Sequence, residues 1–311
     1  MKVNPFNFDE LLAPLSATEF FREYWEQKPL YIERSSRGYD GLISLGDLDS
    51  ILCRYMSNHP IRINKNKIPF PHERFINKSN GFFDVGKVFQ EFENGSTLIL
   101  NKMEHQWEPF RRLNQNFEGA LGHPSSIAVF LNPPNSEALF PHYDFQDIFT
   151  LQVEGQKRWK VFETSVDLPL VGETTPCNSS CYNCIIDASL KPGDLLYIPR
   201  GHVHEVVTEE QYSLHVSVGV ASFKWADLVR ELVENELEFR RALPIGMLNA
   251  NHNEGFDFAP LDKLASLCGN HDHLMQALER VKAKYIKSRT PSSFGNFSTY
   301  NSLDSVDLAI H

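Results

Sequence analysis

The stretch KPGDLLYIPRGHVH, residues 191–204, decides the fold that this chain is expected to adopt. Residues 192–194 form a Pro-Gly-Asp turn signal ahead of the apolar run 195–198, and the Pro-Arg-Gly of residues 199–201 turns the chain again. We therefore expect a short strand between two tight turns. The strand that follows should begin close to His204.

The same pattern of short apolar runs and turn signals extends from Ser126 to about Ala221. Short runs rich in Val, Ile, Phe, Tyr and Leu alternate there with turn signals, at residues 132–135, 154–155, 192–194 and 209–211. Short strands joined by tight turns at regular spacing are typical of all-β architectures. The segment therefore predicts an antiparallel barrel or sandwich.

A mixed helix and strand pattern precedes the barrel. Ser16 and Glu19 have the spacing of a capping box, in which each side chain satisfies a free backbone donor of the other residue. This predicts a helix that runs through Trp25 and ends before Pro29. The apolar residues 30–32 then predict a strand.

A helical pattern follows the barrel. Apolar residues recur at roughly helical spacing after Phe223, and residues 261–286 predict two more helices. The chain is thus expected to be mainly β with helical flanks, in three parts: an N-terminal mixed part packing on the barrel over residues 1–125, a barrel core over 126–222, and a C-terminal helical region over 223–311.

Two separate segments carry candidate metal ligands. In PHYD, residues 141–144, His142 and Asp144 would share one face of an extended strand. His202 and His204 each offer one further imidazole. Two imidazoles and one carboxylate form the facial triad of non-haem Fe(II) oxygenases, which leaves the opposite face of the metal open. The residue pattern predicts iron-dependent oxidation and leaves the choice between His202 and His204 open.

With these motifs, the chain resembles the cupin-like, JmjC-type 2-oxoglutarate oxygenases, a family that includes the ribosomal oxygenases. The resemblance covers several ordered segments, namely residues 20–30, 141–159, 190–205, 213–220 and 241–244. It implies a double-stranded β-helix, that is, a jelly-roll or cupin barrel, with Fe(II) as the metal and 2-oxoglutarate as the cosubstrate.

The resemblance also implies roles for individual residues. His142, Asp144 and His204 match the iron ligands, because the family's third ligand is the histidine just before a Glu or Gln. Lys157 matches the basic residue that binds the distal carboxylate of 2-oxoglutarate. His202 is then expected to be a partly exposed residue at the mouth of the site.

Two positions depart from the family pattern. Phe130 and Gly219 stand where the family often has Tyr and Ser, so two hydroxyls that could bind the cosubstrate are missing. Ser217 is the expected replacement, with Asn132 as the other possibility.

The C-terminal region is expected to mediate dimerisation. The ribosomal oxygenases carry a winged-helix domain after their helical dimerisation region, whereas the present sequence has room only for helices up to His311. A homodimer formed through residues 223–289 is the resulting expectation.

Five cysteines in a chain with no apparent signal peptide indicate reduced thiols rather than disulfides. Cys177, Cys181 and Cys184 form a C-x3-C-x2-C pattern between the two metal motifs. Three thiolates there could bind zinc or an iron–sulfur cluster, with Cys53, Cys268 or a histidine as the fourth ligand. Reduced thiols in a loop that shapes substrate access are the default expectation.

Composition limits the classes of partner. The net charge of −10 argues against a generally basic surface for nucleic acid, and the local basic segment 62–67 is expected to be a solvated loop. No apolar run approaches the roughly 18 residues needed to span a bilayer, which favours a soluble, cytoplasmic protein without a membrane partner.

The sequence therefore favours an Fe(II)- and 2-oxoglutarate-dependent hydroxylase of a protein or peptide side chain. A hydroxylase of a small metabolite or of a biosynthetic peptide is the second reading. A non-catalytic, cupin-like scaffold is the third, because a fold alone does not fix a function.

Overall fold

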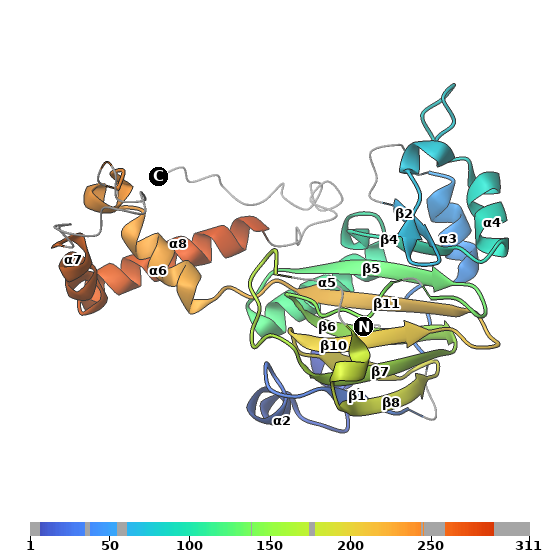
Figure 1. Ribbon diagram of the computed structural model, residues 1–311, viewed down its shortest axis with the longest axis horizontal. Helices are drawn as coiled ribbons and strands as arrows, with labels where there is room; N and C mark the ends of the chain where they lie inside the picture. Colours follow the sequence, from blue (N-terminus) through green and yellow to red (C-terminus); the bar gives the residue numbers. More distant parts are fainter. Residues whose placement is uncertain are drawn as a thin grey trace, which may run out of the picture.

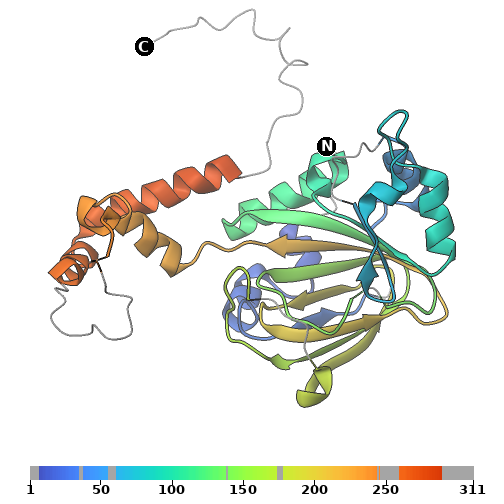
Figure 2. The same ribbon diagram turned by 45° about the horizontal axis from the view of Figure 1, so that its top comes forward.

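The computed structural model describes residues 7–34, 38–54, 61–137, 139–173, 178–243, 245 and 259–288. Two antiparallel sheets face each other and form the barrel at the centre of the molecule (Figures 1 and 2). This architecture, with helices on its flanks, confirms the predicted fold class.

The larger sheet has eight strands in the spatial order β1-β9-β6-β11-β5-β4-β2-β3. Their bounds in that order are Leu30–Ile32, Leu195–Ile198, Asp147–Gly155, Ser213–Val220, Ser125–Asn132, Thr97–Leu100, Ile61–Lys65 and Ile68–Pro69. The smaller sheet has the order β10-β7-β8, with bounds His202–Val207, Lys157–Thr164 and Cys184–Leu190.

Helices cover one face of the larger sheet and extend beyond one end of the barrel. The α-helices α1 to α8 have the bounds Phe8–Leu12, Ala17–Glu23, Leu45–Leu52, Val85–Glu93, Glu108–Leu121, Trp225–Val233, Ala259–Cys268 and His271–Ser288. Four 3-10 helices, η1 to η4, span His72–Phe75, Met103–His105, Ser179–Cys181 and Leu237–Arg240.

Alternation along β11 separates the core from the site. This strand pairs with β5 on one side and β6 on the other, so it is central to the larger sheet. Leu214, Val216 and Val218 belong to the main hydrophobic core. His215 and Ser217, which point to the opposite face because successive side chains alternate, line a cavity inside the barrel.

The core on the outer face of the larger sheet is aromatic. Phe149 of β6 lies 4.9 Å from Phe117 of α5 and 4.7 Å from Tyr197 of β9, measured between ring centroids. Phe8 of α1 and Phe20 of α2 pack against the same ring. Aromatic clusters of this kind bury much apolar area, and this one joins the N-terminal helices to the barrel.

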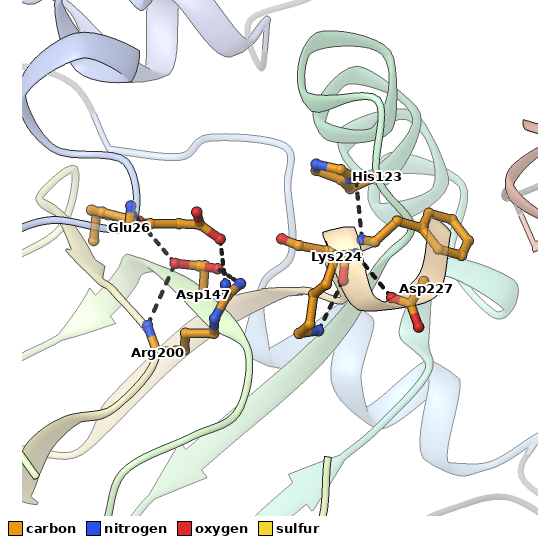
Figure 3. Close-up of polar contacts among 9 residues, drawn as sticks. Glu26, His123, Asp147, Arg200, Lys224 and Asp227 are labelled. Atoms are coloured by element: carbon orange, nitrogen blue, oxygen red, sulfur yellow. Dashed lines mark hydrogen bonds and ion pairs between the residues drawn. The ribbon is translucent and has the colours of Figure 1, made fainter. Parts of the chain in front are cut away.

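Ion pairs and hydrogen bonds tie three parts of the chain together (Figure 3). Arg200, in the turn before β10, pairs with Glu26 at 2.6 Å and with the buried Asp147 at 3.4 Å. Burial raises the pKa of Asp147 to about 6, although the Arg200 charge acts in the opposite direction. At the start of α6, the Phe223 N–H donates to His123 Nδ1 at 3.3 Å and so joins this helix to the end of α5, while the Lys224 N–H caps the helix by donating to the Asp227 side chain at 2.8 Å.

The helices α6, α7 and α8 lie beside the barrel (Figure 1) and share a small core of their own, formed by Leu232, Leu267 and Ala277. The two helices predicted within residues 261–286 are therefore confirmed as α7 and α8. The division into three parts stays a prediction, and β1 to β4 of the first part join the same sheet as the barrel strands. Residues 289–311 lie outside the described residues.

Other local predictions are corrected in detail. The first predicted helix begins after Ser16, whose hydroxyl accepts the Glu19 N–H at 3.2 Å, but it ends at Glu23 rather than at Trp25. Residues 62–67 are not a solvated loop, because 61–65 form strand β2 between β4 and β3. Within the described ranges, no helix has the length and apolarity that crossing a membrane requires.

Candidate metal centre

Backbone pairing brings the two predicted metal motifs together. His142 lies outside the named strands but forms an antiparallel bridge with His204 of β10. The His204 N–H donates to the His142 carbonyl at 2.8 Å, and the His142 N–H donates back at 3.2 Å. The Gly201 N–H donates to the Asp144 carbonyl at 3.0 Å. The turn before β10 therefore holds the loop that carries Asp144.

Three side chains converge at this bridge. His142 Nε2 lies 3.8 Å from Asp144 Oδ1, and His204 Nε2 lies 3.7 Å from Asp144 Oδ2. One nitrogen or oxygen atom from each residue lies within 4.8 Å of the others, a spacing that allows all three to hold one ion. Within the part of the chain that the structure describes, this is the one group of three or more His, Cys, Asp or Glu residues with such spacing.

Both imidazoles are oriented by backbone carbonyls. His142 Nδ1 lies 2.8 Å from the Phe140 carbonyl oxygen, and His204 Nδ1 lies 3.3 Å from that of His202. Since a carbonyl can only accept, each Nδ1 carries the proton and each Nε2 keeps a free lone pair for a metal. Burial, followed by the nearby His142, lowers the pKa of His204 to about 4, which keeps its ring neutral.

His202 takes no part in this group. Its side chain is only 9% exposed, so the expectation of a partly exposed residue is wrong. Tyr143, between the two other candidate ligands, packs instead with Phe162 and Val203. The structure thus brings His204, and not His202, to the side chains of His142 and Asp144.

The cavity beside these residues has a volume of about 380 Å³. Its walls come from both sheets, and they include Arg62, Asn101, Phe130, Gln146, Lys157, Trp159, His215 and Ser217 in addition to the three converging side chains. A larger hollow of about 560 Å³ lies between the barrel and helices α6 and α8. Among the described residues it contains no comparable set of ligands, so we assign the chemistry to the smaller cavity.

Lys157 is the most deeply buried cation of this cavity. Lys157 is the first residue of β7 and is 1% exposed. Its ammonium donates a hydrogen bond to Asn132 Oδ1 at 2.9 Å. No carboxylate of the described residues forms an ion pair with it, and burial alone lowers its pKa to about 7. A buried ammonium without a counter-ion is costly. An anionic ligand that enters the cavity would remove that cost.

Phe130 and Gly219, the two positions that differ from the family pattern, line the same cavity. Ser217 is buried there, with its hydroxyl 3.4 Å from that of Thr150. A Cβ on Gly219 would lie 3.0 Å from Gln146 Oε1, so the Gln146 amide occupies the space that a side chain at 219 would need. The Asn132 side chain accepts a hydrogen bond from Lys157 at 2.9 Å and donates one to Thr97 at 2.7 Å, so its amide already has two partners.

Sequence reasoning missed several of the polar residues in this cavity. His215 and Trp159 are absent from the predicted site residues, although His215 alternates along β11 with the core residues Leu214 and Val216, and both line the cavity. Arg62, expected in a solvated loop, lies on β2 and lines the cavity. The alternation along β11 was the available signal, since it places 215, 217 and 219 on one face.

The cysteine pattern is described only in part. Cys181 and Cys184 are free and exposed, as are Cys53 and Cys268. Cys177 lies outside the described residues. A metal bound by the three loop thiolates therefore stays a prediction.

Comparison with known proteins agrees with this geometry. The model of the JmjC domain family matches residues 102–228. The lysine-specific demethylase and histidyl-hydroxylase NO66 of Drosophila persimilis is 30% identical over 251 residues, which are 76% of this chain and 36% of that protein. Ribosomal oxygenase 2 of Rattus norvegicus is 30% identical over 258 residues, which are 78% of this chain and 55% of that protein.

Solved structures share the fold. An X-ray structure of E. coli YcfD has a TM-score of 0.58 at 20% identity, covering 86% of this chain and 72% of that one. The E. coli ribosomal oxygenase YcfD in complex with cobalt and 2-oxoglutarate has a TM-score of 0.57 at 21% identity, covering 85% and 70%.

The barrel and its histidine and carboxylate group define a cupin-type JmjC fold. Residues 102–228 form a JmjC domain, and the chain is a homologue of the ribosomal oxygenases. It spans about a third and about half of the length of the two curated relatives named above.

Proposed function

We propose that this protein is an Fe(II)- and 2-oxoglutarate-dependent oxygenase that hydroxylates a side chain of a protein or peptide. The observation that carries the proposal is the presence, in one cavity, of the His142, Asp144 and His204 group and of a buried Lys157 that has no counter-ion among the described residues. The donor set fits iron, and the isolated ammonium fits a dicarboxylate cosubstrate.

Each residue has a distinct part in this proposal. His142, Asp144 and His204 would hold the metal from one side, with the two Nδ1 protons fixed on backbone carbonyls. Lys157 would bind the distal carboxylate of 2-oxoglutarate, with Ser217 as a further polar contact. When bound, iron would supply the oxidative chemistry: O2 and 2-oxoglutarate give succinate and CO2, with one oxygen atom of O2 in succinate and the other inserted into a substrate C–H bond. The enclosing walls exclude water around Lys157.

The names of the relatives support a protein or peptide substrate, because they include a histidyl-hydroxylase and ribosomal oxygenases. Hydroxylation of a small metabolite or of a biosynthetic peptide is the alternative within the same chemistry. The choice between the two substrate classes rests on which molecule can enter the cavity, whose lining includes Arg62, Asn101 and Leu139. Action in the cytoplasm stays a prediction from the sequence.

We also propose that two copies associate through the helical region. Trp225 at the start of α6 is 84% exposed, and Leu237, Leu261 and Ile286 are exposed on the same region. Exposed apolar side chains gathered in one region mark interaction surfaces in soluble proteins. Molar mass from light scattering should give twice the chain mass of 35.7 kDa, and Trp225→Asp should shift the protein toward the monomer.

A direct test of the substrate class uses iron-loaded protein with 2-oxoglutarate, ascorbate and a library of peptides from ribosomal proteins. A product heavier by one oxygen atom, seen by mass spectrometry and lost in Asp144→Ala, would support the proposal. Oxidation of small-molecule candidates with no oxidation of any peptide would favour the metabolite reading. A protein that binds neither metal nor 2-oxoglutarate would be the scaffold.

A further inference from the structure

His215 is a buried polar side chain of the cavity to which the proposed reaction has assigned no role. It lies at the centre of the larger sheet, on β11, and is 1% exposed. Its Nδ1 is buried and has no hydrogen-bond partner among the described residues. Leaving a buried polar atom unsatisfied costs stability. Such a group is an exception that requires a reason.

His215 and Lys157 share the same neighbouring side chains. The His215 ring stacks on Phe130, with centroids 4.8 Å apart and planes 5° apart, and meets the Trp159 ring edge-on at 5.5 Å. The Lys157 ammonium lies 5.8 Å from the centroid of Phe130 and 5.6 Å from that of Trp159. The same two aromatic rings therefore flank both polar groups, and all four residues line one cavity.

The charge state of His215 suits a donor to an anion. Burial, followed by the charge of Lys157, lowers the pKa of His215 well below its ordinary value, so the ring is neutral and carries one N–H. Trp159, whose Nε1 is also buried without a hydrogen-bond partner among the described residues, lines the same cavity. The lining thus carries the Lys157 ammonium and the His215 imidazole together, and the candidate metal ligand Asp144 is the one carboxylate among its described residues.

We propose that His215 donates a hydrogen bond to the carboxylate that Lys157 binds, and so takes over the part of the hydroxyl that Phe130 lacks. This inference rests on the proposed function, because it takes 2-oxoglutarate as the source of that carboxylate. Phe130 acts as the stacking platform that holds the imidazole in place. His215 is therefore a residue that determines specificity for a dicarboxylate cosubstrate.

If His215 had only a structural role, its partner would be a neighbouring side chain and not the cosubstrate. Gln152 lies directly across from it on β6, and Gln152 Oε1 is also buried without a partner. If His215 served only to pack against Gln152, its replacement would lower stability and leave ligand binding unchanged. The two roles therefore predict opposite results.

The test is calorimetric titration of the full-length, Mn(II)-loaded protein with two ligands. One is 2-oxoglutarate, and the other is 2-oxopentanoate, which keeps the 2-oxo acid end and lacks the distal carboxylate. His215→Phe preserves the ring that stacks on Phe130 and removes the N–H. Because this variant loses a hydrogen bond to a charged group, we expect it to bind 2-oxoglutarate about 10- to 100-fold more weakly than the wild type. The Kd of 2-oxopentanoate should change by less than about twofold.

Controls separate the possible failures. His215→Gln, which restores an N–H, should recover part of the affinity, and Gln152→Ala should leave it unchanged. Without ligand, His215→Phe should unfold at the same temperature as the wild type or higher, because it removes a buried unsatisfied group. Equal Kd values for 2-oxoglutarate in His215→Phe and the wild type, or an equal loss for both ligands, would overturn the role of His215. Failure of the wild type to bind 2-oxoglutarate at all would overturn the proposed function itself.

Discussion

The backbones of His142 and His204 are paired, with the His204 N–H 2.8 Å from the His142 carbonyl oxygen. This bridge joins the loop before β6 to strand β10 of the smaller sheet. The spacing of the two imidazoles is therefore set by main-chain hydrogen bonding and does not depend on a bound ion. A site of this kind is ready before the metal arrives, which lowers the cost of ordering its ligands.

Replacement of His204 should abolish metal binding, whereas replacement of His202 should not. Loss of an outer partner of a metal ligand already costs about 10- to 100-fold in affinity, so His204→Ala should lose more than about 100-fold. His202→Ala should stay within about threefold of the wild type, since His202 lies outside the converging group. Titration with Mn(II), after circular dichroism has shown that both variants fold, measures the difference. A large loss in His202→Ala alone would contradict the assignment.

Lys157 should make both stability and cosubstrate binding depend on pH. Its pKa in the folded state, about 7, lies below its ordinary value of 10.5, so the folded protein binds fewer protons between these values. Stability without ligand should therefore rise with pH from about 7 toward 10.5. Lys157→Met should raise stability at pH 6 by roughly 2–4 kcal/mol and weaken 2-oxoglutarate binding strongly.

Urea unfolding at several pH values and calorimetry check these two effects. In the wild type, affinity for 2-oxoglutarate should fall as pH rises above about 7, because the ammonium that binds the carboxylate is lost. Unchanged 2-oxoglutarate affinity in Lys157→Met would show that the ammonium does not serve the cosubstrate.

Asn132 should act through Lys157. Asn132→Ala removes the hydrogen bond that the Lys157 ammonium donates and a second bond to Thr97, so stability should fall by about 1–3 kcal/mol. We expect about tenfold weaker binding of 2-oxoglutarate and an unchanged affinity for Mn(II). Thr97→Val is the matched control, because it removes the second bond and leaves the contact with Lys157 intact. Equal effects of the two variants on 2-oxoglutarate binding would exclude a positioning role.

Gly201 should be irreplaceable in the turn before β10. Its φ is +89°, and a Cβ there would lie 2.0 Å from the Val166 carbonyl oxygen. Gly201→Ala should cost more than about 3 kcal/mol, since the clash adds to backbone strain. Gly41 has a φ of +79° with no atom within 4 Å of the added Cβ, so Gly41→Ala should cost about 1–2 kcal/mol. Similar stabilities of the two variants in urea unfolding would refute the close approach.

The sequence predicted the metal group and the barrel, because both depend on local signals. The H-x-D triplet and the turn before residues 202–204 are motifs of a few residues, whereas the resemblance to a family selected His204 over His202 and also selected Lys157. The role of Asn132 and the unsatisfied state of His215 depend on which side chains meet across β5, β7 and β11. Such contacts join strands that are distant in the chain, and no spacing within one segment encodes them.

The burial of His202 shows the same limit. A histidine beside a Pro-Arg-Gly turn suggests exposure, yet His202 is the first residue of β10 and pairs with Thr164 of β7. Likewise, Arg62 belongs to a strand because β4 is available beside it, where Arg62 pairs with Ile99. Local composition could not reveal either arrangement.

The central claim is that this protein couples oxidation of 2-oxoglutarate to activation of O2 at the His142, Asp144 and His204 group. Its most direct test is the formation of succinate by iron-loaded protein under ¹⁸O2, followed by mass spectrometry and accompanied by an iron count. We predict succinate that carries one ¹⁸O atom in the wild type and in His202→Ala, and none in His204→Ala. Iron-loaded wild type that forms no labelled succinate, with or without the peptide library, would contradict the account.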